Sequence, residues 1–464
     1  MNAEDNSQYS VLGTRNALDD DLHAFIAQAM AHYHIPGVAV GVDNNGVQQI
    51  GGLGVTNVDH PLAVDERTLY QIGSISKTFV GTTAMRLVEQ GKLDLDAPIR
   101  TYLPGLKLAD AEATERATMR HLLTHTGGWV GDYFDDLGAG DDALAKMIVA
   151  MADVPQVAPL GTLWSYNNAG FALAGRIIEV LTGQPFEAAV RSLVLDPLGM
   201  KHTYFFARNI VTERFAVGHT ITDGTATVAR PWELPRTANP AGGLLSDVLD
   251  LLIYARFHMG DGTAQDGARV LSAESLAFMQ SPLYSKGSGG AMGLTWMLED
   301  VGGVGTVRHG GGTVGQQTTF VMVPSRNFAL AVLTNADRGS ELHGEATDWI
   351  LRRYLGLEDP EPAPLDATAD QRAPYAGRYT AAMQDIELTV GDGGFSLQRI
   401  PKGGFPNKEV AAPATPPPVR AALYAENLLI CLDEPMKGTR GEFLRDSDGT
   451  LAWLRLGSRA HRRV

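Results

Sequence analysis

The spacing of apolar residues predicts helices and strands in alternation along most of the chain. Apolar positions recur with helical period over residues 17–33, which predicts a helix that ends at Ile35-Pro36-Gly37. Two short apolar runs, 38–42 and 47–50, are separated by a turn containing Asn45-Gly46, which predicts an antiparallel hairpin. Further helices are expected over 119–124, 144–151, 170–182, 247–259 and 341–355, and further strands over 318–323 and 328–333.

The segment from Gln71 to Val88 is apolar around nearly its whole circumference, which predicts a helix buried on most sides and stopped by Gly91. Ser74 and Lys77 are three residues apart and leave the same helical face. Burial disfavours the charged form of a lysine, so Lys77 is predicted to accept a proton from Ser74. This pairing is typical of Ser-x-x-Lys acyl-transfer enzymes.

Two further polar clusters stand in loops. Pro159 to Asn168 reads either as a turn before a helix or as a rigid loop that directs Tyr166 and Asn168 into a cleft, where a phenol beside a lysine can share in proton transfer. Around His309, the glycines from Gly310 to Gly315 match a dinucleotide motif, but a strand follows them instead of a helix. We therefore expect His309 and the glycine amides to line a cleft.

Metal chemistry is not expected from His121 and His125, because no adjacent glutamate and no third ligand accompany their spacing. The 464 residues include 38 basic and 53 acidic side chains, a net charge of −15, which argues against nucleic acid or an anionic membrane as partner. One cysteine, Cys431, excludes an internal disulfide. The N-terminus has no secretion-signal pattern and no apolar run could span a bilayer, so a cytoplasmic location is expected.

The composition changes after Leu355. A Pro-rich linker is predicted over 358–373, and short alternating runs separated by Gly, Asp and Pro predict a small antiparallel β-barrel over 374–464. The basic end, which includes Arg455, Arg459 and His461, reads as a solvated tail or as a group that reaches the cleft and selects a carboxylate. The preceding region, 1–357, is predicted to be one domain.

Taken in order, Ser74-Ile75-Ser76-Lys77, Tyr166-Asn167-Asn168 and His309-Gly310-Gly311 resemble the three motifs of the serine β-lactamase and penicillin-binding-protein superfamily. The similar branch contains class C β-lactamases, esterases and D-peptidases. This resemblance implies an α+β fold, an antiparallel sheet flanked by helices with a helical subdomain. The C-terminal part resembles appended lipocalin-like domains.

The resemblance also implies roles for these residues. Ser74 would be the nucleophile, Lys77 its base, and Tyr166 a proton carrier. Substrate would be bound by Asn168, His309 and Gly311, and the oxyanion hole would be formed by the amides of Ser74 and Gly312. His309 stands where many β-lactamases and DD-peptidases have lysine, and an imidazole is mostly neutral near pH 7.

The expected function is a serine hydrolase or acyltransferase that acts on small esters, amides or short peptides without metal or cofactor. The alternatives are a β-lactamase or DD-carboxypeptidase, a thioesterase that cyclises peptides, and an inactive binding protein. The oligomeric state is not predicted.

Overall fold

The computed structural model describes residues 14–464, so the N-terminal segment used to predict localisation lies outside the described residues. Within them the chain forms two compact units. Unit 1 contains residues up to 95, 174–283 and 292–359, and unit 2 contains 96–173, 284–291 and 360–464. Each unit is thus assembled from segments distant in sequence. The predicted domain limits at 357 and 374 remain predictions.

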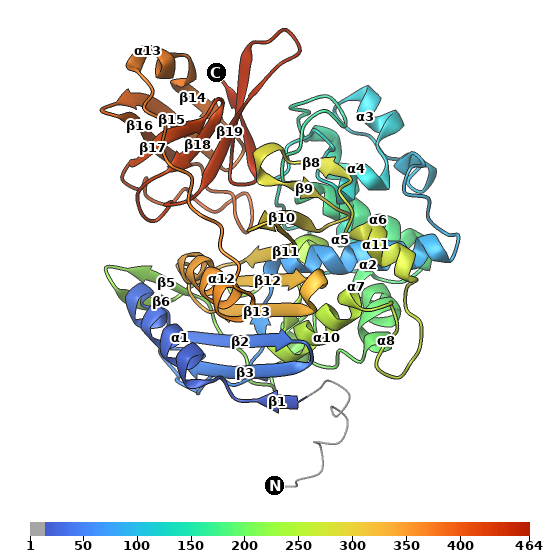
Figure 1. Cartoon of the computed structure of the whole chain (residues 1–464). Helices are drawn as coiled ribbons and strands as arrows, with labels where there is room; N and C mark the ends of the chain where they lie inside the picture. Colours follow the sequence, from blue (N-terminus) through green and yellow to red (C-terminus); the bar gives the residue numbers. More distant parts are fainter. Residues whose placement is uncertain (1–13) are drawn as a thin grey trace. The chain divides into compact units, whose positions relative to one another are not determined.

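A mixed sheet forms the centre of unit 1 (Figure 1). Neighbouring strands are antiparallel except β1, which pairs in parallel with β3. The predicted antiparallel sheet is therefore confirmed in its main part. In spatial order these strands are β1 (Thr14–Asn16), β3 (Val47–Gly54), β2 (Gly37–Asn44), β13 (Phe328–Thr334), β12 (Gln317–Val323), β11 (Val304–Gly312) and β10 (Met297–Val301).

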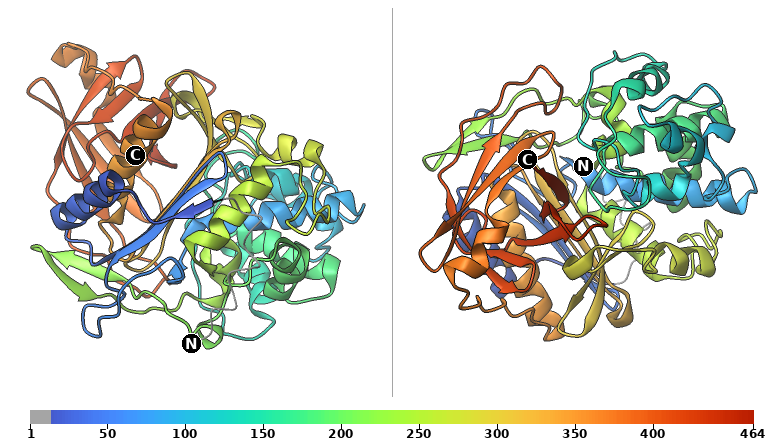
Figure 2. Two further views of the ribbon diagram at one scale, coloured as in Figure 1. Left: turned by 60° about the horizontal axis from the view of Figure 1, so that its bottom comes forward. Right: turned by 90° about the horizontal axis from the view of Figure 1, so that it is seen from above.

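Helices cover both faces of this sheet. On one face, α1 (Asp20–Tyr33) and α12 (Gly339–Leu355) lie side by side (Figure 2) and bury apolar residues against β2, β12 and β13. On the other, α10 (Val248–Met259) packs on Gly41 of β2, where an added Cβ would lie 3.2 Å from Val248 and Leu252 atoms. The ring of Phe79 in α2 (Ser76–Glu89) stacks on Tyr254 of α10 at 4.0 Å. The predicted α2 helix is confirmed as buried on most of its sides.

Shorter elements complete unit 1. They are β4 (Tyr70–Gln71) paired with β7 (Leu245–Ser246), β5 (His219–Thr222) paired with β6 (Thr225–Val228), and the helices α7 (Phe186–Val190), α8 (Asp196–Leu198), α9 (Asn239–Gly242) and α11 (Ala273–Met279).

Unit 2 combines a helical region with the C-terminal barrel. The helical region contains α3 (Ala111–Arg116), α4 (Met119–Leu123), α5 (Ala143–Ala150) and the first turn of α6 (Ala169–Thr182). The 284–291 segment contains the short strand β8 (Tyr284–Ser285) and the first residue of β9 (Ala291–Met292). Ala452 and Trp453 of the barrel pack with Ala158 of the helical region in one apolar cluster. The barrel is therefore part of the same compact unit as the loop that carries Tyr166.

The barrel is closed and antiparallel, as the alternating runs predicted. Its interior is apolar and includes Tyr379, Phe395 and Phe443. The basic end is not a free tail, because it forms the last strand and pairs with the first. After α13 (Ala369–Arg372), the strands are β14 (Gly377–Thr380), β15 (Gln384–Gly391), β16 (Gly394–Pro401), β17 (Val419–Ala425), β18 (Leu428–Cys431), β19 (Arg440–Arg445), β20 (Leu451–Leu456) and β21 (Arg459–Arg463).

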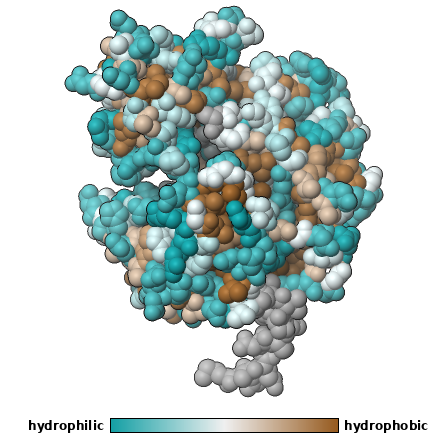
Figure 3. All heavy atoms as spheres, viewed as in Figure 1, coloured by the Kyte–Doolittle hydropathy of each residue, from teal (hydrophilic) through white to brown (hydrophobic). Residues whose placement is uncertain are grey.

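Hydrophilic side chains cover much of the visible surface, with hydrophobic ones in separate areas between them (Figure 3). Large apolar side chains that are exposed, such as Val149 and Val211, come from different elements. Across residues 14–464, every helix is too short or too polar to cross a membrane.

Candidate active site

Ser74 lies in a 3₁₀ turn, Gly73–Ile75, that leads directly into α2. Gly73 has φ of +50°, a conformation that L side chains rarely adopt, and an added Cβ there would lie 2.6 Å from the backbone nitrogen of Gly312. Only glycine fits before the serine. The turn leaves Ser74 partly exposed while the helix behind it is buried.

Lys77 is fully buried one turn after Ser74, as predicted. Its Nζ donates a hydrogen bond to Ser74 Oγ at 3.1 Å and another to the carbonyl oxygen of Ala241 at 2.5 Å. A buried amine is costly as a cation, and these contacts hold its nitrogen against the serine oxygen. The structure therefore joins the predicted nucleophile and its base.

The contribution of Ala241 was missed from sequence. Its carbonyl belongs to α9, which Glu187 supports by accepting hydrogen bonds from Asn239 Nδ2 at 2.7 Å and from Arg236 Nε at 3.0 Å. Ser76 Oγ also ties α2 to this region, because it accepts from the Leu244 backbone N–H at 3.0 Å. A backbone carbonyl that acts as acceptor leaves no side-chain signal in the sequence.

Strand β11 lies against the Ser74 turn. An added Cβ on Gly311 would lie 2.0 Å from the carbonyl oxygen of Ile72 and 2.6 Å from Thr318 Oγ1. Glycine therefore lets the two backbones approach as closely as they do, which explains the glycine run as a packing requirement. The predicted oxyanion donors, the amides of Ser74 and Gly312, belong to these two adjoining segments.

His309 also lies on β11, opposite Phe320 of β12, and is buried. Its Nδ1 lies 2.6 Å from the carbonyl oxygen of Gly310. After Gly312 the chain turns, with the Thr313 N–H donating to Gln316 O, and continues as β12. The strand continuation that excluded a dinucleotide site is confirmed, whereas substrate binding by His309 and Gly311 stays a prediction.

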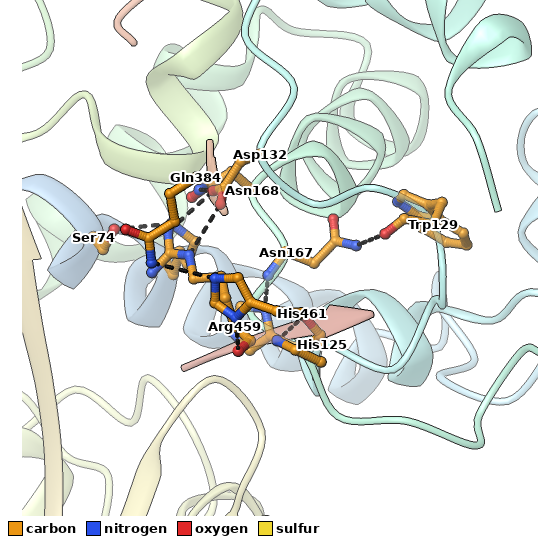
Figure 4. Close-up of polar contacts among 12 residues, drawn as sticks. Ser74, His125, Trp129, Asp132, Asn167, Asn168, Gln384, Arg459 and His461 are labelled. Carbon is orange, nitrogen blue, oxygen red and sulfur yellow. Dashed lines mark hydrogen bonds and ion pairs between the residues drawn. The ribbon is translucent and has the colours of Figure 1, made fainter. Parts of the chain in front are cut away.

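Tyr166 and Asn168 belong to unit 2, in the loop before α6. Figure 4 shows Asn168 beside Asp132. The Tyr166 N–H donates to the carbonyl of Ser458 at 2.8 Å, and its ring stacks on His125 with centroids 4.4 Å apart. Asn168 Nδ2 donates to Asp132 Oδ1 at 2.8 Å. The loop is thus a rigid structure with both side chains fixed. That Tyr166 and Asn168 act together with Ser74 and Lys77 stays a prediction.

Two charged residues of unit 2 border this loop. Arg459 of β21 donates Nε and Nη2 hydrogen bonds, each 3.0 Å, to the two carboxylate oxygens of Asp132. Its guanidinium carbon lies 4.7 Å from the centre of the Tyr166 ring. The pKa of Arg459 is raised: burial opposes the charged form, but the carboxylate of Asp132 and then the phenol of Tyr166 favour it. Asp132 had no motif by which the sequence could reveal it.

His121 has a structural role at the start of α4. Its Nδ1 accepts the Thr118 backbone N–H at 3.2 Å in a capping box. Burial lowers the pKa of its imidazole. His125 is occupied as acceptor of the Asn167 N–H at 3.0 Å. Within residues 14–464, no cluster of three or more His, Cys, Asp or Glu side chains is arranged to hold a metal ion.

Comparison with known proteins adds independent information. The Beta-lactamase family model matches residues 22–354. Penicillin-binding protein 4 of Amycolatopsis lactamdurans is 36% identical over 362 residues, which cover 75% of this chain and 93% of that protein. Esterase EstB of Burkholderia gladioli is 29% identical over 333 residues, covering 62% and 82%. A solved structure of SurE matches with a TM-score of 0.72 and 25% identity over 96% of this chain and 98% of that one.

Proposed function

Because this chain belongs to the Beta-lactamase family of serine hydrolases, we propose that it forms a covalent acyl-enzyme at Ser74 with small esters, amides or short peptides. The observation that carries the proposal is the 3.1 Å contact between Lys77 Nζ and Ser74 Oγ. The lysine is fully buried and its nitrogen lies within hydrogen-bonding distance of the serine oxygen, which supports its role as the group that takes up the serine proton.

The reaction proceeds in two stages. Ser74 Oγ attacks the substrate carbonyl carbon as its proton moves to Lys77, and the backbone N–H groups of Ser74 and Gly312 bind the resulting oxyanion. Tyr166 passes a proton to the leaving group as the bond to it breaks. Water, or an amine acceptor, then attacks the acyl carbon and gives its proton to the Tyr166 phenolate. Lys77 returns its proton to Ser74 Oγ as the bond from that oxygen to the acyl carbon breaks. Each oxyanion donor contributes about 3 kcal/mol to transition-state stabilisation.

The substrate class follows from the third motif and from the relatives. An imidazole at position 309 attracts a substrate carboxylate less than a lysine does near pH 7. This favours neutral esters and amides over β-lactams, and a relative at 29% identity is an esterase. Asn168, His309 and Gly311 are proposed to contact the substrate.

Penicillin recognition is a second candidate function. It is supported by the 36% identity to a protein named Penicillin-binding protein 4. Turnover of nitrocefin would indicate a β-lactamase, and a stable penicillin adduct without turnover would indicate a DD-peptidase type of site. Both use the same serine.

The test is a substrate panel applied to the parent and to Ser74→Ala. The panel contains p-nitrophenyl butyrate, nitrocefin, and D- and L-amino-acid amides, each with and without an added amine. We expect S74A to lose at least about 10³-fold in kcat/KM on the best substrate. A fluorophosphonate adduct should map by mass spectrometry to Ser74. Ser340→Ala, at an exposed serine of α12, is the control and should match the parent. Retained activity in S74A would refute the proposal.

A further inference from the structure

The hairpin formed by β20 and β21 of the barrel is bonded to the Tyr166 loop at its tip and at the start of β21. The Ser458 carbonyl accepts the Tyr166 N–H at 2.8 Å, and the Ala460 N–H donates to Ser165 Oγ at 3.1 Å. Arg455 Nη2 adds a 2.6 Å hydrogen bond to the carbonyl of Lys286. The bonds from Ser458 and Ala460 fix the hairpin against the loop, so the residue between them, Arg459, has a defined place.

Asp132 links the hairpin to the family's second motif. One carboxylate oxygen accepts from both Asn168 Nδ2 at 2.8 Å and Arg459 Nη2 at 3.0 Å, and the other accepts from Arg459 Nε at 3.0 Å. The Asp132 side chain is only 7% exposed. A bidentate arginine–carboxylate pair is directional, so it fixes the plane of the guanidinium as well as its position.

We propose that Arg459 is a positioning residue for Tyr166, held over the tyrosine ring by Asp132 so that its positive charge favours the deprotonated phenolic oxygen. The guanidinium carbon lies 4.7 Å from the ring centre. A cation placed over an aromatic ring stabilises negative charge on that ring more than the neutral phenol. The inference rests on the proposed function, in which Tyr166 carries the proton.

The groups that face Tyr166 within unit 2 include His125, whose ring stacks on it, and the Arg459–Asp132 pair. His461, two residues after Arg459, is fully buried, and burial lowers the pKa of its imidazole to about 4. It therefore stays neutral near pH 7 and adds no competing charge. His125 Nδ1 accepts the Asn167 N–H, and Arg459 places a permanent cation beside the ring.

The test compares Arg459→Gln with Arg462→Gln in the full-length protein. Arg462 is a matched control, since it lies on the same strand, with its guanidinium 5.2 Å from the Trp453 ring, and is exposed. With p-nitrophenyl butyrate, R459Q should lower kcat about 10-fold to 100-fold with KM changed less than about 3-fold. It should also move the alkaline limb of the kcat/KM profile, which reports loss of the Tyr166 proton, upward by about half a pH unit or more. R462Q should leave both unchanged.

The same measurement in a Tyr166→Phe background separates this inference from the proposed function. If Arg459 acts through Tyr166, R459Q adds less than about 2-fold to the loss already caused by Y166F. An equal loss in both backgrounds would overturn the inference while Ser74 chemistry stands. Full activity of Y166F would instead refute the proton-carrying role of Tyr166. If near-UV circular dichroism shows that R459Q disrupts the barrel, Arg459→Met, which keeps the apolar stem and removes the charge, decides the question. The same upward shift is expected, and an unshifted limb refutes the inference.

Discussion

Lys77 combines a structural cost with a chemical use. Its amine is fully buried and hydrogen-bonded to Ser74 Oγ and to the Ala241 carbonyl. An amine is costly to bury, and an apolar residue of similar length would pack there without that cost. If Lys77 is present for its chemistry, replacing it by an apolar residue should lower activity without lowering the stability of the fold.

Substitution of Lys77 tests this expectation for activity and stability together. Lys77→Met keeps the length of the side chain but cannot accept a proton, so we expect kcat/KM to fall at least about 10³-fold. The thermal midpoint should stay within a few degrees of the parent or rise, because the buried amine is removed. Lys92→Arg, at an exposed lysine, should change neither quantity. A K77M variant that melts far below the parent would show that Lys77 is chiefly structural.

At the level of elements, the close approach of β11 to the Ser74 turn should control the geometry of the oxyanion hole. The Cβ of Gly311→Ala would lie 2.0 Å from the Ile72 carbonyl oxygen, so strand and turn must separate. We expect about a 10²-fold loss in kcat, since the neighbouring Gly312 amide moves with the strand. Gly305→Ala on the same strand meets nothing within 4 Å and is the control. Kinetics of both variants that match the parent would contradict this.

The elements themselves could largely be read from sequence, because their signals are local. The Asn45-Gly46 turn has both residues at positive φ, 53° and 89°, and joins β2 to β3 as predicted. Gly91, at φ of 68°, follows α2 as the expected stop. The parallel pairing of β1 with β3 was missed, since a strand of three residues, Thr14–Asn16, carries no readable alternation.

At the level of the whole molecule, prediction failed where contacts join distant segments. Ser74 and Lys77 were paired correctly because a helix places them one turn apart. The link from Arg459 to Asp132 spans 327 residues and had no such local rule. The basic end was interpreted either as a solvated tail or as a group that reaches the cleft. In the structure β-pairing buries His461, and Arg459 lies over the Tyr166 ring. Local sequence patterns therefore predicted the Ser74–Lys77 contact, whereas the contacts of Arg459 and Asp132 depend on tertiary packing.

A buried histidine and a buried aspartate should make the free energy of unfolding depend on pH in opposite directions. One substitution at each position can measure the two contributions separately. Burial lowers the pKa of His343 to about 3, so below about pH 6.5 the unfolded chain binds a proton that the folded one does not, and stability is lost as pH falls. Burial, with Asp247 nearby, raises the pKa of Asp250 to about 8, so its contribution is present at low pH and is lost as pH rises from about 4 toward 8.

Each group alters the free energy of unfolding by about 1.4 kcal/mol per pH unit within its window. As the pH falls from 7 to 5, the stability of His343→Gln should therefore rise relative to that of the parent. Over the same fall in pH, the stability of Asp250→Asn relative to the parent should decrease. Thermal midpoints at pH 7, 6 and 5 measure both, with His60→Gln at an exposed histidine as control. The opposite signs are the decisive feature, because a general loss of packing would lower the midpoints of both variants equally at every pH. Parallel curves for the two variants would mean that neither group is held in the protonation state that its burial implies.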